Sequence, residues 1–264
     1  MSVENLSLAG RSILITRSSE QAESTAEAVR ARDATPLLLP TLEMECLHEN
    51  IQASIPLLEH KKTEILFTSR NGVASVAAVL GDAFAPLLSF HSVTAVGDKT
   101  AAALAELGIQ TTMQPESASQ AGLIKAYKKR GAPEQLLFYR AEEGSDALAN
   151  ALTAAGCHVT TIHAYRMQCP DSDASEMIRK MERSEVDAVL LGSARTVYHY
   201  IQRVGSIETA NTPAIAVISQ QVAKAAEHAG LNVQAVAKTA SFDAMLDALA
   251  DYFNDSGAEN HVSS

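Results

Sequence analysis

The chain repeats itself once, and this repeat restricts the possible folds more than any other feature of the sequence. Two short apolar runs end in arginine, SILITR at Arg17 and QLLFYR at Arg140, which are 123 residues apart. The segment EILFTSRNGV matches AVLLGSARTV, which places Ser69 and Ser193 124 residues apart. Because order, spacing and residue type agree, we interpret the pattern as an internal duplication. A period of this length indicates two domains of one fold.

A third matching pair follows the next apolar run of each half. AVGDKTAAALAELG aligns with VISQQVAKAAEHAG, and Gly108 and Gly230 are 122 residues apart. Strands that alternate with helical patterns predict an α/β fold with parallel sheets and right-handed crossovers. The apolar runs that we expect to form strands are 12–16, 64–68, 92–96, 135–139, 187–191 and 214–218.

Two segments interrupt this alternation at matching positions. LPTLEMECL (39–47) and IHAYRMQCP (162–170) each continue a strand-like run as an extended segment of mixed polarity. We expect them to lie side by side as a two-stranded connection that the chain crosses twice. One domain would then hold 1–40 plus 167–264, the other would hold 45–163, and the cleft between them would be the default ligand site.

Composition excludes several classes of function. Lys plus Arg is 21 and Asp plus Glu is 31, so the net charge of −10 disfavours nucleic-acid and membrane-surface partners. The three cysteines lack CxxC spacing, as is typical of reduced thiols in the cytoplasm. We see no signal peptide in MSVENLSLAG, and no apolar run that approaches the roughly 20 residues of a membrane span. The histidines show no metal-ligand spacing, so we expect no metal site.

The stretch TAVGDKTAAALAELG (94–108) has the strand, glycine turn and helix order of an anion site. It lacks the glycines of a P-loop and of a dinucleotide fingerprint. Free N–H groups at the start of the helix, together with Lys99 and the Thr100 hydroxyl, could hold a carboxylate. The structural alternative is that Asp98 caps its own helix. This stretch alone does not decide between the two interpretations.

Other polar side chains follow the strands in both halves. They are Thr68, Ser69 and Asn71 in FTSRNGV, Ser193 in LGSARTV, and Arg17 and Arg140 after the first strand of each half. All are expected at the carboxyl ends of parallel strands, where open α/β sheets bind ligands. Helix caps would explain one serine or asparagine in each turn, but not the matching arginines Arg70 and Arg195 as well, which favours a binding role for these turns. For each arginine taken singly, a surface ion pair is the plainer explanation.

In these motifs the chain resembles the uroporphyrinogen-III synthase family of tetrapyrrole biosynthesis. Each motif alone has low specificity, but their order and spacing are distinctive and the resemblance covers nearly the whole chain. The matching segments are ITR (15–17), ILFTSRNGV (65–73), TAVGDKTAAALAELGI (94–109), ALTAAGCHVTTIHAYRM (151–167) and IAVISQQVAKAAEHAGL (215–231).

The resemblance implies two similar flavodoxin-like parallel-sheet domains joined by a two-stranded β-ladder linker. It also implies a cofactor-independent, cyclising hydro-lyase. Such an enzyme takes the linear tetrapyrrole hydroxymethylbilane, removes its hydroxyl as water, closes the ring and inverts the last pyrrole. We expect a cytoplasmic monomer, and direct handover of the substrate by the preceding pathway enzyme is one possible route of supply.

The resemblance also assigns roles to individual residues. Tyr165 matches the tyrosine of the family's linker and would help the hydroxide to leave. Thr68, Ser69, Thr100 and Ser193 match positions that line the cleft and would hold acetate and propionate groups.

The second copy departs from the family pattern. It reads ISQQVA, with Val222 in place of the usual threonine, so Ser219, Gln220 and backbone N–H groups would have to substitute for that donor.

Two other interpretations compete with the synthase. A non-enzymatic two-domain protein could close on a small anion, but the sequence offers neither an export signal nor a motif for a transport partner. A different enzyme with similar domains could use a nucleotide or a flavin, but the phosphate fingerprints are absent.

Overall fold

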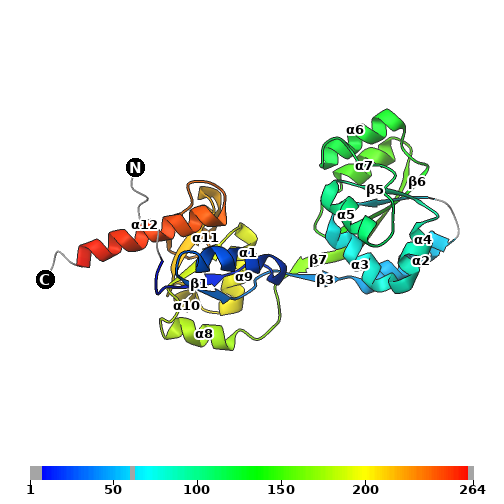
Figure 1. Cartoon of the computed structure of the whole chain (residues 1–264). Helices are drawn as coiled ribbons and strands as arrows, with labels where there is room; N and C mark the ends of the chain where they lie inside the picture. Colours follow the sequence, from blue (N-terminus) through cyan, green and yellow to red (C-terminus); the bar gives the residue numbers. More distant parts are fainter. Residues whose placement is uncertain (1–7, 60–62, 261–264) are drawn as a thin grey trace. The chain divides into compact units, whose positions relative to one another are not determined.

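The computed structural model describes residues 8–59 and 63–260 (Figure 1). The chain divides into two compact units, the first formed by Met1–Glu43 with Gln168–Ser264 and the second by Met44–Met167. Each unit is described by itself.

The first unit contains a five-stranded sheet in the order β10-β9-β8-β1-β2, and its neighbouring strands pair in parallel. The strands are β1 (Ser12–Ile15), β2 (Thr35–Leu38), β8 (Ala188–Leu191), β9 (Ala214–Val217) and β10 (Val233–Val236). The helices are α1 (Ser19–Arg30), α8 (Ser175–Glu182), α9 (Ala194–Val204), α10 (Ile207–Ala210), α11 (Gln220–His228) and α12 (Phe242–Asn260).

Successive side chains of β1 pack against different helices, so this sheet is covered on both faces. Ile13 and Ile15 pack into a cluster with residues of α1 and α12, whereas Leu14 packs with residues of α9 and α11. Successive side chains of a strand point to opposite faces, so a continuous apolar run such as SILI needs helices on both sides.

The second unit contains a five-stranded sheet in the order β3-β7-β6-β4-β5. Its β4-β5, β4-β6 and β6-β7 pairs are parallel. The strands are β3 (Glu43–Cys46), β4 (Glu64–Phe67), β5 (Ser92–Ala95), β6 (Gln135–Ala141) and β7 (His158–Gln168). The helical segments are α2 (His48–Glu59), α3 (Arg70–Leu80), a 3₁₀ turn (Gly81–Ala83), α4 (Phe84–Leu88), α5 (Asp98–Glu106), α6 (Gln120–Arg130) and α7 (Ala147–Ala154).

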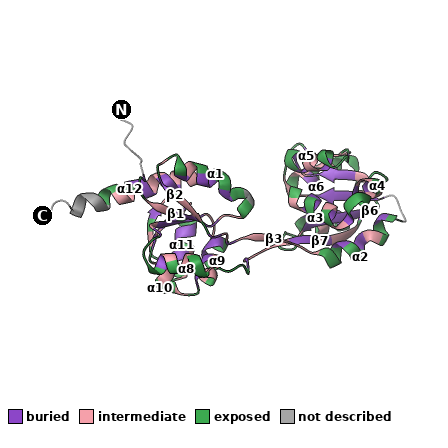
Figure 2. Ribbon diagram, turned by 60° about the horizontal axis from the view of Figure 1, so that its bottom comes forward, coloured by how far each residue is buried: buried purple, intermediate pink, exposed green. Residues whose placement is uncertain are grey.

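This sheet is also covered on both faces. Ile65 and Phe67 of β4 pack with α2, α3 and α5, whereas Leu66 packs with α6 and α7. In both units the strands at the centre of the sheet are largely buried, and the exposed residues lie mainly on the outer sides of the helices (Figure 2). The prediction of an α/β fold with parallel sheets is therefore confirmed, and all six predicted runs form strands.

The duplicated runs occupy equivalent places in the two sheets. The matched pairs are β1 with β6, β8 with β4, and β9 with β5, and the orders β2-β1-β8-β9 and β7-β6-β4-β5 correspond. In the first sheet β10 pairs with the outer side of β9. At the equivalent place in the second sheet, a single parallel bridge joins Thr94 of β5 to Met113. Each repeat therefore specifies the same central strand arrangement.

The sequence predicts no apolar run as long as a membrane span. One helical stretch is nevertheless long and apolar enough to cross a membrane, by length and composition only. This stretch, Arg70–Leu88, comprises α3, the 3₁₀ turn and α4. Val73, Val76, Leu80 and Leu88 contribute to the hydrophobic core of the second unit. Its apolar character is thus explained by packing within this unit.

We expect Leu66→Ala to lower the free energy of unfolding by about 3 kcal/mol, because it removes a fully buried side chain and leaves a cavity. The shift of the urea unfolding curve measures this change. Leu57→Ala is the matched control, since 45% of Leu57 is exposed on α2 and its loss should cost about 0.5 kcal/mol or less. Equal shifts for the two variants would contradict the packing described for β4.

Candidate functional site

The end of β4 and the start of α3 hold three of the predicted site residues. Ser69 is the N-cap of α3 in an extended conformation, and its Oγ accepts a hydrogen bond from the Gly72 N–H at 3.0 Å. Thr68 precedes Ser69 and Asn71 is the second residue of α3, and both are half-buried. Ser69 is therefore a helix cap, as one interpretation of the sequence predicted. The cap hydrogen bond uses only part of the hydrogen-bonding capacity of the serine hydroxyl.

Tyr165 uses the remaining capacity of that hydroxyl. It lies on β7 with 7% of its surface exposed, and its hydroxyl is 2.9 Å from Ser69 Oγ. The backbone carbonyl of Tyr165 accepts from the Glu142 N–H at 2.9 Å, which fixes the strand at this point. The structure therefore brings together two predicted site residues that are 96 positions apart in the sequence.

The geometry restricts how this hydroxyl pair can act. The Gly72 N–H occupies one lone pair of Ser69 Oγ, and either hydroxyl can donate to the other. If Ser69 donates, the Tyr165 proton is free to point toward a ligand, and the same serine proton would stabilise negative charge on the phenol oxygen. The pair can therefore act as a positioned hydrogen-bond donor or weak acid.

The turn before α5 differs from the predicted arrangement. Gly97 is the N-cap of α5, while Asp98 is the first helical residue and accepts from Gln114 Nε2 at 2.6 Å. The alternative in which Asp98 caps this helix is therefore wrong. Thr100 is only 4% exposed, whereas Lys99 is exposed. A ligand at this turn would reach Lys99 more readily than the Thr100 hydroxyl.

In the first unit the predicted serines also cap helices. Ser193 and Thr196 form a capping box, with Ser193 Oγ accepting from the Thr196 N–H at 3.2 Å and Thr196 Oγ1 accepting from the Ser193 N–H at 3.0 Å. Ser219 Oγ accepts from the Val222 N–H at 3.4 Å. Gln220 is exposed at the start of α11.

Val222, which replaces the family's threonine, is a core residue of the first unit. It lies on α11 and is buried in one cluster with Val197 and Tyr200 of α9 and with Ala226. Thr100, its counterpart in the second unit, is also buried. Packing therefore accounts for an apolar side chain at this position, whatever the role of the threonine in relatives.

Arg140 supports the loop that follows β6. It is 3% exposed and donates to the carbonyl oxygens of Ala141 at 3.0 Å and Ser145 at 2.9 Å, and also to the carbonyl oxygen of Gly144. It forms an ion pair of 2.8 Å with Asp146. Substrate binding by Arg140 stays a prediction, and in the structure its donors hold its own loop.

Arg17 is half-buried and also has partners within its own unit. It donates to Thr25 Oγ1 at 3.1 Å and to Gln21 Oε1 at 2.9 Å, and its guanidinium lies 4.4 Å from the Phe242 ring centroid. Burial lowers the pKa of Arg17. Its role toward a ligand likewise stays a prediction.

The sequence analysis missed a buried acidic centre in the second unit. Glu64, 6% exposed, accepts from Thr94 Oγ1 and from the Tyr127 hydroxyl, each at 2.7 Å, and forms an ion pair with Arg130. Burial and the nearby Glu64 carboxylate raise the pKa of Tyr127. The available signal was a glutamate at the start of the apolar run EILF, which we assigned only to a strand.

A second missed pair lies one strand away from Tyr165. The Tyr139 hydroxyl on β6 is 2.7 Å from Ser54 Oγ, and both residues are buried. Burial raises the pKa of Tyr139 to about 12. In residues 8–59 and 63–260 no group of three or more His, Cys, Asp and Glu side chains is placed to hold a metal ion.

Comparison with known protein families gives one match over most of the chain. Residues 23–247 match the family model described as uroporphyrinogen-III synthase HemD.

Two curated proteins are among the relatives. The chain is 26% identical over 250 residues to a porphyrin biosynthesis protein HemD of Ruminiclostridium josui, covering 92% of this chain and 49% of that protein. It is 27% identical over 210 residues to a uroporphyrinogen-III synthase of Synechococcus elongatus, covering 75% of this chain and 76% of that protein. The chain thus spans about half the length of the first relative.

Solved structures show the same fold. A mutant uroporphyrinogen III synthase of Thermus thermophilus is 19% identical with a TM-score of 0.53, covering 93% of this chain and 100% of that one. A uroporphyrinogen-III synthetase of Helicobacter pylori is 16% identical with a TM-score of 0.59, covering 91% of this chain and 99% of that one. At these identities the likeness concerns the fold alone.

We expect Arg140→Lys to lower the free energy of unfolding by roughly 2 kcal/mol, because one ammonium cannot serve the four acceptors of the guanidinium in the same geometry. Chemical denaturation measures this loss. Arg17→Lys is the control, because the more exposed Arg17 serves only side-chain acceptors and its replacement should cost less than about 1 kcal/mol. A loss at Arg17 as large as that at Arg140 would contradict the structural role of Arg140.

Proposed function

Since this chain belongs to the uroporphyrinogen-III synthase family, we propose that it converts hydroxymethylbilane to uroporphyrinogen III. The match over residues 23–247 is the observation that carries this proposal. The reaction removes the terminal hydroxyl as water, closes the ring and inverts the last pyrrole. The match disfavours the alternative of a non-enzymatic protein that closes on a small anion.

In the proposed mechanism Tyr165 assists the first step. Its phenol donates a hydrogen bond, and then its proton, to the leaving hydroxyl. The carbon–oxygen bond breaks, water departs and a cationic azafulvene remains. Ser69 supports this role from 2.9 Å, because its hydroxyl can donate to the phenol oxygen as negative charge develops there. Ring closure then forms a carbon–carbon bond at the bound cation, and the proton that the cyclised product loses returns to the Tyr165 oxygen. The enzyme's part in this step is to steer which carbon attacks.

The substrate carries eight carboxylates, and we propose that the polar strand ends bind them. Side chains at the surface or half-buried are the best placed for this role, whereas Thr100 and Arg140 are buried and would contribute less directly. The proposed set of substrate-binding residues is Arg17, Thr68, Ser69, Asn71, Lys99, Thr100, Arg140, Ser193, Ser219 and Gln220.

We further propose that both units are flavodoxin-like domains. In chain order the strands of the first unit read 2-1-3-4-5 across the sheet, which supports this assignment. The proposed domains are 1–40 plus 167–264 and 45–163. A two-stranded ladder of the segments 39–47 and 162–170 would join them, and the pairing of β3 with β7 supports this linker. We place the protein in the cytoplasm as a monomer, and substrate handover by the preceding pathway enzyme belongs to the same proposal.

An isomer assay tests the proposed reaction. Hydroxymethylbilane is generated in situ with and without the protein, the products are oxidised and the porphyrin isomers are separated. We expect isomer III with the protein and isomer I, the spontaneous product, without it. Isomer I alone in both reactions would overturn the proposed function.

We expect Tyr165→Phe to lower turnover by about 100-fold, which is within the range that one general acid contributes. This loss should be larger than the losses caused by Ser69→Ala and Thr100→Ala. Steady-state turnover with hydroxymethylbilane measures this. Tyr139→Phe is the matched control, because it removes the same kind of tyrosine–serine hydrogen bond from the same unit. It should leave turnover near the wild-type value. Unchanged turnover in Tyr165→Phe would remove Tyr165 from the mechanism.

A further inference from the structure

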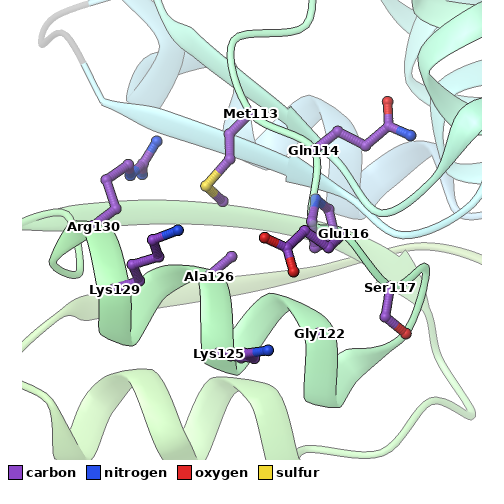
Figure 3. A pocket seen from close by; sticks show the side chains of 10 residues that line it. Met113, Gln114, Glu116, Ser117, Gly122, Lys125, Ala126, Lys129 and Arg130 are labelled. Atoms are coloured by element: carbon purple, nitrogen blue, oxygen red, sulfur yellow. The ribbon is translucent and has the colours of Figure 1, made fainter.

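A pocket of about 720 Å³ lies in the second unit (Figure 3). It lies between the segment 113–117 and α6, at the edge of the sheet where Met113 bridges to β5. Its volume is within the usual range for small-molecule sites. The lining residues are Met113, Gln114, Pro115, Glu116, Ser117, Gly122, Lys125, Ala126, Lys129 and Arg130.

The pocket is separated from Tyr165 by the sheet itself. Tyr165 belongs to the hydrophobic cluster on the face covered by α2, α3 and α5, whereas α6 packs on the opposite face. Strands β6 and β4 also lie between β7, which carries Tyr165, and β5 beside the pocket. The pocket therefore requires its own explanation.

Contacts within the second unit fix the walls at both ends of the pocket. At one end, Ser119 Oγ accepts from the Gly122 N–H at 3.0 Å, and a Cβ on Gly122 would collide with the Ser117 carbonyl oxygen. Only glycine allows this close approach of the segment to α6. At the other end, Arg130 is fixed by its ion pair with the buried Glu64. The walls are thus preorganised, which reduces the entropic cost of binding.

The lining combines an apolar body with a few charged groups. The Met113 side chain, the Lys129 ammonium and the Glu116 carboxylate all point into the same space (Figure 3). Met113, Pro115 and Ala126 offer apolar surface, and a methionine adapts readily to flat or irregular ligands. Apolar surface combined with charged groups at fixed positions is found in small-molecule pockets.

The charges indicate the sign of the ligand. Lys125 and Lys129 are one helical turn apart on α6, and neither forms an ion pair with another residue in the described part of the chain. Arg130 is balanced by Glu64, so the two lysines against Glu116 leave one net positive charge. In a chain of net charge −10, this local excess favours one anionic group, and Glu116 would repel a second.

We propose that this pocket binds a small amphipathic monoanion, an apolar ring-sized body that carries a single carboxylate. The body lies on Met113 and Ala126, the carboxylate pairs with the Lys129 ammonium, and Lys125 adds positive charge from the preceding turn of α6. Glu116 disfavours molecules with many carboxylates, which separates this site from one built for the eight-carboxylate bilane.

Binding of 1-naphthoate to the full chain, measured by isothermal titration calorimetry, tests the proposal. Lys125→Gln with Lys129→Gln should raise Kd by about tenfold, because both of the lysine charges that line the pocket are lost. Ala126→Leu should weaken binding at least as much by filling the pocket. Lys128→Gln is the matched control, because Lys128 is exposed on the same helix but does not line the pocket. It should leave Kd within about twofold.

Two further ligands test the charge argument. The neutral 1-naphthylmethanol should bind about tenfold more weakly than 1-naphthoate, and naphthalene-1,4-dicarboxylate should also bind more weakly. Absence of 1-naphthoate binding at millimolar concentration would overturn the proposal, and so would equal Kd values in the wild type and the double lysine variant. Both lysines are exposed, so circular dichroism should show an intact fold in that variant even if Ala126→Leu fails to fold.

Discussion

Burial of the central strands on both faces is the constraint on which the rest of this structure depends. Ile13, Leu14 and Ile15 in one sheet, and Ile65, Leu66 and Phe67 in the other, are fully buried because helices pack on both sides. Such strands leave little room for polar side chains between their ends. Ligand-binding groups are therefore confined to the carboxyl ends of the strands, to the helix starts and to the edges of the sheets.

At those strand ends, the same polar residue can serve the fold and the chemistry. Ser69, Ser193 and Ser219 each satisfy a backbone N–H at the start of a helix. Ser69 differs because a second partner, the Tyr165 hydroxyl, lies within hydrogen-bond distance. A cap alone fixes the local backbone, whereas this pair also positions a phenol. That difference is why the proposed chemistry is assigned to the second unit.

Buried charge in this protein is handled in two ways. Arg140 is surrounded by carbonyl oxygens of its own loop, and Glu64 is surrounded by donors from Thr94, Tyr127 and Arg130. Both sets of contacts offset the desolvation of a buried ion. The Glu64–Arg130 pair has a further consequence, since it fixes one wall of the pocket beside α6.

The sequence by itself determined the α/β class, the parallel sheets, the positions of the six strands and the duplication, because these depend on local apolar runs and on their spacing. It also indicated the family through the order of weak motifs. Tertiary structure alone decided that Tyr165 meets Ser69, that Arg140 and Thr100 are buried, and that Glu64 collects three donors. These outcomes depend on side chains that the fold brings together from distant strands and helices. The local sequence around each residue does not indicate which of these side chains it will contact.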